Sequence, residues 1–191
     1  ATFIRQVSAN RIEGYRYSTG WAAHQWVYFT AEFSERIKDL YIIDATNRVF
    51  SDKREITAEG IEGTGVKAIM DFGPLSQPLF VKVGISSVDT QGAANNLDKE
   101  IGNRSFMVVK EEAADAWEQV LSKVKVSSQD TALLRTFYTA MYHACIAPSL
   151  HSDADGRYRG ADHEIHTASG YHQYSTFSLW DTFRAAHPLY T

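Results

Sequence analysis

Apolar and polar residues alternate with a period of two from residue 1 to about residue 88. In QWVYFTAEF the alternation places a set of apolar side chains on one face of an extended chain: Val27, Phe29, Ala31 and Phe33. The same pattern occurs in VKAIMDF and FVKVGIS, and turn-forming stretches such as EGTG and GPLSQP separate the runs. This predicts an antiparallel sheet or sandwich. The expected strands lie near residues 2–7, 11–18, 25–33, 40–50, 66–72 and 80–86.

After about residue 104 the apolar period becomes three or four residues, which predicts helices. The first helix is expected over residues 105–122. A second begins after the cap candidates Ser127 and Ser128 and ends before Pro148. Because apolar residues surround this second helix, we expect it to be buried on more than one side.

A third helix is expected over residues 179–186, bounded by HP, and HEIHT and YHQYST around ASG predict a small hairpin. The chain of 191 residues is long enough for one domain or two small ones. The change of period near residue 105 is the boundary that we expect. It separates a strand-rich domain over 1–104 from a helical part, in which a helix and linker over 105–127 precede a second helical region over 128–191.

Charge and composition limit the classes of partner. The net charge is -4 and the pI is near 6.0, so the chain has no basic field for nucleic acid or anionic membranes. The sequence contains no apolar stretch long enough for a membrane span. Aromatic residues make up 13% of the chain, and Tyr and Trp suit both core packing and stacking under sugar rings.

Cys145 is the only cysteine, which excludes an intrachain disulfide and a cysteine-based metal cluster. It lies in the apolar run YHACIAP, where we expect a buried, inert thiol. There is no G-x-S-x-G motif and no recognisable phosphate loop, so acyl transfer and nucleotide chemistry are disfavoured.

The acidic loop HSDADGRYRG is a candidate metal site. Asp153 and Asp155 form a D-x-D-G pattern like the opening of a calcium loop, but the further oxygen ligands of such a loop are missing. The favoured interpretation is an Asx-turn loop whose carboxylates meet Arg157 and Arg159. The histidines of this region do not have helical metal-ligand spacing, so most are expected to be hydrogen-bonded surface or core residues.

The stretch SLWDTFRAAHP carries the strongest candidate chemistry. Trp180, Asp181 and Arg184 at a helix start can stack on a pyranose ring and hydrogen-bond two neighbouring hydroxyls. The helix dipole also explains an acid in the first turn, although it does not explain the adjacent Trp.

Two long motifs, FYTAMYHACIAPSLHSDADGRYRG and YSTFSLWDTFRAAHPL, resemble glycoside hydrolase family 92, the calcium-dependent inverting exo-α-mannosidases. STGWAAHQWVYFTAEFS and AADAWEQVL are also similar to that family. The resemblance implies a multi-domain β + α fold, an antiparallel β-sandwich followed by the first helices of an incomplete (α/α)6 barrel that begins at about residue 128. It also implies that the catalytic carboxylates and most calcium ligands lie beyond Thr191.

The resemblance further implies roles for single residues. Trp180 and Asp181 are expected in the mannose subsite, with Arg184 as a weaker candidate. His143, Asp155 and Arg157 are expected to be structural supports near that site.

The functional hypothesis is therefore an exo-acting α-mannosidase, cleaving α-1,2 links of N-glycan or mannan-type glycans with inversion, of which this chain alone is inactive. The resemblance implies calcium as cofactor of the complete enzyme and a periplasmic or extracellular location. The alternative is a non-catalytic carbohydrate-binding β-sandwich module. Exposed apolar faces of barrel helices also predict self-association of the chain.

Overall fold

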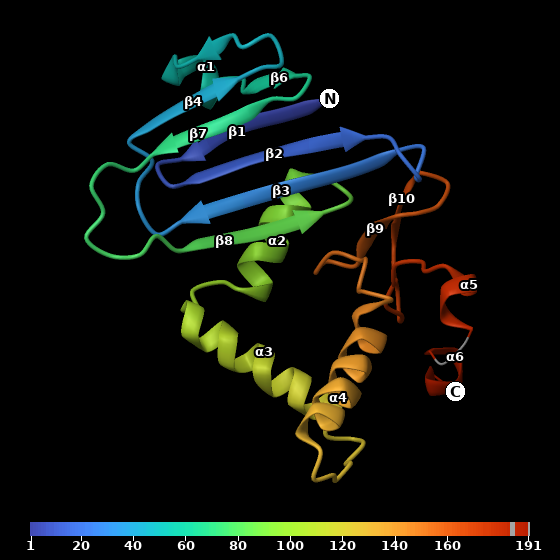
Figure 1. The fold of residues 1–191 in the computed structure, drawn as a ribbon. Helices are drawn as coiled ribbons and strands as arrows, with labels where there is room; N and C mark the ends of the chain where they lie inside the picture. The colour runs from blue at the N-terminus through green and yellow to red at the C-terminus, as the bar shows by residue number, and fades with distance from the viewer. Residues whose placement is uncertain (184–185, 191) are drawn as a thin grey trace. The chain divides into compact units, whose positions relative to one another are not determined.

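The computed structural model describes residues 1–183 and 186–190, which form two compact units (Figure 1). The sheet unit contains Ala1–Asn103 and Ser152–Gly170, and the helical unit contains Arg104–His151 and Tyr171–Thr191. The expected domains, 1–104, 105–127 and 128–191, stay a prediction. The two compact units are not the same as these domains, because the segment 152–170 packs with the sheet unit.

The larger sheet is antiparallel and has the strand order β6-β1-β2-β3-β8. Its strands are β1 (Thr2–Ser8), β2 (Arg11–Ser18), β3 (Gln25–Phe33), β6 (Ile61–Gly63) and β8 (Val81–Ser86). Four of these are the strands expected from the alternating pattern, whereas β6 was not expected. Between Gln6 and Ser8 the pairing of β1 with β2 shifts, so that Val7 has no partner in the ladder.

A second antiparallel sheet has the order β5-β4-β7. Its strands are β4 (Asp39–Ile43), β5 (Val49–Phe50) and β7 (Lys67–Asp71). The single strand expected over 40–50 is wrong, since a turn divides it. Asp44 accepts hydrogen bonds from the backbone N–H groups of Thr46 and Arg48, and Asn47 has a φ of 64°. The short helix α1 (Lys53–Ala58) follows β5 and is capped by Asp52.

The two sheets pack together through their apolar faces. Ala31 and Phe33 of the larger sheet, Ile42 of the smaller sheet and Ile56 of α1 belong to one buried cluster. The face predicted for 25–33 is confirmed for Ala31 and Phe33, and Phe29 packs against the cluster, whereas Val27 at the start of the strand is 37% exposed. Val66 is buried beside β7. Each fully buried Ile contributes about 1.5–3 kcal/mol to folding.

The helix α2 (Thr90–Glu100) covers the end of the larger sheet at β8. Gly84 permits a close approach, because a Cβ there would lie 2.2 Å from the carbonyl oxygen of Ala93. Leu97 of α2 is buried, whereas Val83 and Ile85 on the opposite face of β8 are exposed. Sequence periodicity did not reveal α2, because its Gly and Asn residues are weak helix formers and packing against the sheet stabilises it.

A small hairpin in the segment 152–170 pairs β9 (Arg157–Arg159) with β10 (Ile165–Thr167). The hairpin expected between HEIHT and YHQYST is therefore wrong. HEIHT pairs with RYR of the acidic loop, and YHQYST forms only a bridge between Tyr174 and Leu150 in the helical unit. Both halves of the expected pair contain strand-like residues, so the sequence alone did not select the partner.

The helical unit contains α3 (Phe106–Leu121) and α4 (Thr131–Ile146), which confirms the two helices expected from the apolar period. The cap of α4 is Asp130 rather than Ser127 or Ser128, since the Asp130 carboxylate accepts from the backbone N–H groups of Ala132 and Leu133. The rings of Trp117 and Tyr142 join the helices at 4.5 Å.

None of the described residues of the helical unit is buried. The burial expected for residues 131–146 is therefore not found, and Cys145 is exposed instead of enclosed. The helices contact each other along one side only, which leaves apolar residues such as Leu133 and Ile146 in solvent. In the described part of the chain, no helix has the length and hydropathy needed to cross a membrane.

Candidate functional site

The predicted sugar-binding stretch lies on α5 (Leu179–Thr182) of the helical unit. Trp180 is 78% exposed, so its indole face is open to a ligand. Asp181 lies within α5, but its side chain is outside what the structure describes, as is all of Arg184. The roles of the three candidates in sugar binding therefore stay predictions.

A second short helix, α6 (Ala186–Tyr190), follows α5. The end expected at HP is wrong, because Pro188 lies in the first turn of α6, where a missing N–H costs no helical hydrogen bond. The Tyr190 hydroxyl lies within donating distance of two carbonyl oxygens at the end of α4, 2.8 Å from that of Ala144 and 2.9 Å from that of Ala147. These contacts hold α6 on α4 and so position the segment that carries Trp180.

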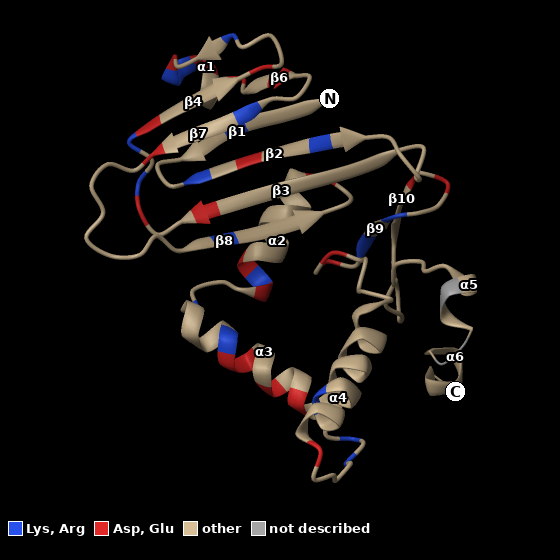
Figure 2. Ribbon diagram, viewed as in Figure 1, with Lys and Arg blue, Asp and Glu red and all other residues tan. Residues whose placement is uncertain are grey.

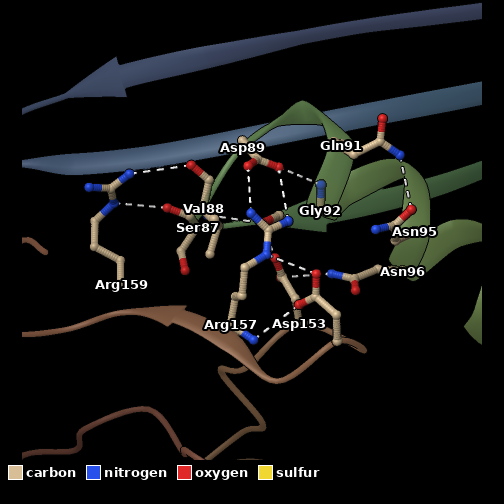
Figure 3. Close-up of polar contacts among 12 residues, drawn as sticks. Ser87, Val88, Asp89, Gln91, Gly92, Asn95, Asn96, Asp153, Arg157 and Arg159 are labelled. Atoms are coloured by element: carbon tan, nitrogen blue, oxygen red, sulfur yellow. Dashed lines mark hydrogen bonds and ion pairs between the residues drawn. The ribbon is translucent and has the colours of Figure 1, made fainter. Parts of the chain in front are cut away.

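A buried polar network lies in the sheet unit, where the segment 152–170 meets α2 (Figure 3). Asp153 is 6% exposed and accepts hydrogen bonds from Ser86 Oγ at 2.6 Å and Asn96 Nδ2 at 2.8 Å. Asn96 Oδ1 in turn accepts from the backbone N–H of Ala154 at 2.7 Å. A Cβ at Gly92 would lie 2.3 Å from an Asp153 oxygen, so only Gly permits this approach.

Arg157 extends the network with two carboxylates. Its guanidinium lies 2.8 Å from Asp89 and 2.8 Å from Asp155. Burial opposes ionisation of both acids, but the Arg157 hydrogen bonds and those from backbone N–H groups outweigh it, so the pKa values of Asp89 and Asp155 are lowered. The same two partners raise the pKa of Arg157. The ionised side chains of Asp89, Asp155 and Arg157 therefore attract one another, and the pair between Arg157 and Asp89 connects the hairpin to the start of α2.

The favoured interpretation of the acidic loop is thus correct for Asp155 and incomplete for the rest. Asp153 binds Ser86 and Asn96, not an arginine, and Arg159 donates to the carbonyl oxygens of Ser87 and Val88. Within the described ranges, no three His, Cys, Asp or Glu side chains form a group that could hold a metal ion. Calcium as cofactor of the complete enzyme stays a prediction.

The proposed supports of the site lie in different units. Asp155 and Arg157 belong to the network of the sheet unit, whereas His143 lies on α4, where its ring is 5.6 Å from that of Tyr142. Sequence reasoning missed Ser86, Asp89 and Asn96. The stretch SSVDTQG was an available signal for Asp89, since Asp is a favoured cap at the start of a helix.

The outer face of the larger sheet carries an aromatic row. Its members alternate with the core residues and lie on β1, β2 and β3: Phe3, Tyr15, Tyr17, Trp26 and Tyr28. The Trp26 ring is 4.5 Å from that of Tyr17 and stacks on Tyr28 at 6.0 Å. Burial and the hydrogen bond to Glu62 raise the pKa of Tyr15 to about 12. All five residues are half-buried.

Comparison with known protein families gives matches for residues 1–86 and for residues 92–191. Residues 1–86 match the model of the glycosyl hydrolase family 92 N-terminal domain, and residues 92–191 match that of the family 92 catalytic domain. A comparison with curated proteins gives no match.

Solved structures agree with these matches. The family GH92 alpha-mannosidase BT3965 from Bacteroides thetaiotaomicron is similar, with 32% identity, a TM-score of 0.83, and coverage of 99% of this chain and 26% of that one. A structure of the same protein in complex with mannoimidazole matches equally well. The family GH92 inverting mannosidase BT2199 from the same organism has the same fold, with 23% identity, a TM-score of 0.83, and coverage of 99% and 26%. The chain thus spans about a quarter of the length of these solved relatives.

Proposed function

Because the chain belongs to glycosyl hydrolase family 92, we propose that it is part of an exo-acting α-mannosidase that releases terminal mannose from N-glycan or mannan-type glycans with inversion. The observation that carries this proposal is the 32% identity, over 99% of the chain, to an alpha-mannosidase. The complex of that relative with mannoimidazole supports a mannose-containing substrate. We further propose α-1,2 links as the substrate bonds.

In this proposal Trp180 is a stacking platform for a mannose ring. Its 78% exposure leaves the indole face accessible, and a pyranose ring presents C–H groups to such a face. Asp181 and Arg184, its neighbours in sequence, are proposed to hydrogen-bond sugar hydroxyls.

We also propose that the chain of 191 residues does not catalyse by itself. An inverting glycosidase needs a carboxylic acid with a raised pKa and a carboxylate about 6.5–9.5 Å away. Among the described residues, the carboxyl groups with a shifted pKa are all shifted downward: Asp44, Asp89, Asp155 and Asp162. A lowered pKa keeps these groups ionised at neutral pH, which suits ion pairs rather than protonation of a leaving oxygen.

Calcium and location belong to the complete enzyme in this proposal. Since the described residues gather no group that could hold a metal, the calcium ligands are proposed to come mainly from outside this chain. When bound, calcium would contact sugar hydroxyls through its oxygen-rich shell. A periplasmic or extracellular location is proposed from the resemblance to the family alone.

Mannose release from α-1,2-mannobiose, measured with and without calcium, tests the proposal. The chain of 191 residues is expected to release none, whereas a longer protein of the same reading frame is expected to release mannose and to prefer α-1,2 over α-1,3 links. Turnover by the short chain would show that it holds its own acid and base. Absence of turnover by the longer protein would contradict the mannosidase itself.

A carbohydrate-binding module is the second candidate, and the aromatic row favours it. The half-buried residues around Trp26 bring several aromatic rings together, with Trp26 stacked on Tyr28 and tilted by 40° against Tyr17. Titration of mannose and mannobiose into Trp26→Ala and Asp181→Ala variants separates the two functions. Loss of binding through Trp26 alone supports the module, and loss through Asp181 alone supports the subsite on α5.

Self-association follows from the exposed apolar residues of the helical unit, which include Leu133 and Ile146. Light scattering is expected to show dimers or larger species as the protein concentration rises. A monomer across the whole concentration range would contradict this expectation.

A further inference from the structure

A surface cavity of about 330 Å³ lies in the sheet unit, where the end of β1, the segment between β3 and β4, and α1 meet. Its size is at the lower end of the range for sites that bind small molecules. None of its lining residues belongs to the motifs or the polar network described above.

The lining of the cavity has one sign of charge. Three of its ten residues are cationic, Arg36, Lys38 and Lys53, and none is an Asp or Glu. The chain as a whole has 23 acidic and 19 basic residues, so this is not the average character of its surface. Figure 2 shows Lys and Arg in blue on α1 and on the segment before β4.

The three cations are weakly engaged. Among the described residues, Arg36 forms no ion pair or hydrogen bond. The Lys38 ammonium is 3.9 Å from the Asp71 carboxylate, at the limit of an ion pair. The Lys53 ammonium donates only to the carbonyl oxygen of Lys38, at 3.3 Å, which holds it on the same side of the cavity as Lys38. These charges are therefore available to a ligand.

The walls of the cavity are fixed by backbone contacts and buried side chains. Ile37 and Leu40, which also line it, are 8% and 5% exposed and belong to the core cluster. The Ile37 N–H donates to the carbonyl oxygen of Ala9 at 2.8 Å, and the Lys38 N–H donates to that of Asp71 at 2.8 Å. Val7, which also lines the cavity, lies outside the ladder at the shift in register between Gln6 and Ser8. The backbone that carries Arg36 and Lys38 is thus held in place by hydrogen bonds and by the core.

We propose that this cavity binds the phosphate or sulfate group of a small molecule. A guanidinium donates a fork of N–H groups to a tetrahedral oxyanion, and two ammonium groups add positive charge. The volume accommodates the anionic group together with a small polar body. The site is separate from the proposed glycan hydrolysis and does not depend on it.

Isothermal titration calorimetry of the chain with inorganic phosphate and with sulfate, at low ionic strength, tests the proposal. Arg36→Gln and Lys53→Gln are each expected to weaken binding about tenfold, because each removes a charge-assisted contact. Arg54→Gln is the matched control, since Arg54 is a cation on the same short helix that does not line the cavity. Circular dichroism confirms that the variants fold, as expected for exposed side chains.

Saturable binding that depends on Arg36 and Lys53 but not on Arg54 supports the site. Tighter binding of phosphate then identifies phosphate esters as the ligand class, and tighter binding of sulfate identifies sulfate esters. The proposal is overturned by absence of saturable binding for both anions, by binding that the two variants leave unchanged, or by equal weakening in Arg54→Gln.

Discussion

The sheet unit and the helical unit contain regular secondary structure to a similar extent, yet only one of them has a core. Ile42, Ile56 and Leu97 of the sheet unit are at most 2% exposed, whereas none of the described residues of the helical unit is buried. The helices α3 and α4 have side-chain caps and the correct apolar period, but they touch each other along one side only. Helical periodicity and capping are therefore enough to form α3 and α4, but burial of their apolar side chains requires packing against further elements.

Truncating a core side chain is expected to give the largest loss of stability, and to distinguish the two units most clearly. Ile42→Ala should lower the free energy of unfolding of the sheet unit by about 2–5 kcal/mol, because it leaves a cavity in a packed interior. Leu133 lies on α4 and is 58% exposed, so Leu133→Ala should change the free energy of unfolding of the helical unit by no more than about 0.5 kcal/mol. Urea denaturation followed by circular dichroism measures both. Equal losses would show that the helical unit has a core of its own.

Breaking the polar network is expected to have the next largest effect. Asp153→Ala leaves the buried groups of Ser86 and Asn96 without their acceptor and should cost about 1–3 kcal/mol. Asp155→Ala is the matched control, since its ion pair is more exposed and should contribute less than about 1 kcal/mol. Urea denaturation gives the two losses, and limited proteolysis of 152–170 shows whether the hairpin is released. A control variant as unstable as Asp153→Ala would contradict the central role of Asp153.

Acid should weaken the same network. The pKa values of Asp89 and Asp155 are lower in the folded chain than the ordinary value near 3.8, so the stability they contribute is present above about pH 4. It is lost as pH falls through their lowered pKa values, by less than about 1 kcal/mol for each partly exposed pair. The measurement is the free energy of unfolding between pH 7 and pH 3.

The variant Arg157→Gln isolates this contribution, because Asp44 and Asp162 also have lowered pKa values and respond to acid independently of Arg157. Its stability should depend less on pH than that of the unchanged chain. An identical pH dependence would show that Arg157 does not hold the two carboxylates in their ionised form.

Trp180→Ala should change stability least. Its side chain is 78% exposed, so the expected change in the free energy of unfolding is within about 0.5 kcal/mol. In a longer protein with mannosidase activity, the same variant should lower kcat/KM, since the proposed stacking platform is lost. A large loss of stability would instead show that Trp180 packs within the unit.

The sheet was largely predictable because period-two alternation over strands such as β2 and β3 has few alternative interpretations. The elements that were missed depend on contacts distant in sequence. Asp89 caps α2 through a local contact with Gly92, but it also pairs with Arg157, 68 residues later, and that second contact is not visible within a local window. The same holds for the candidate site. The motif SLWDTF can be recognised in the sequence, whereas the exposure of Trp180 is a property of the folded chain.

The sequence by itself determined the strands β1, β2, β3 and β8, the helices α3 and α4, the face of β3 that carries Ala31 and Phe33, and the family to which the chain is similar. These follow from side-chain periodicity and from motifs, which are properties of neighbouring positions. The tertiary structure decided that 152–170 packs with the sheet unit, that Cys145 is exposed, and that three cations meet around one cavity. Each of these depends on which distant segments become neighbours, and periodicity carries no information about that choice.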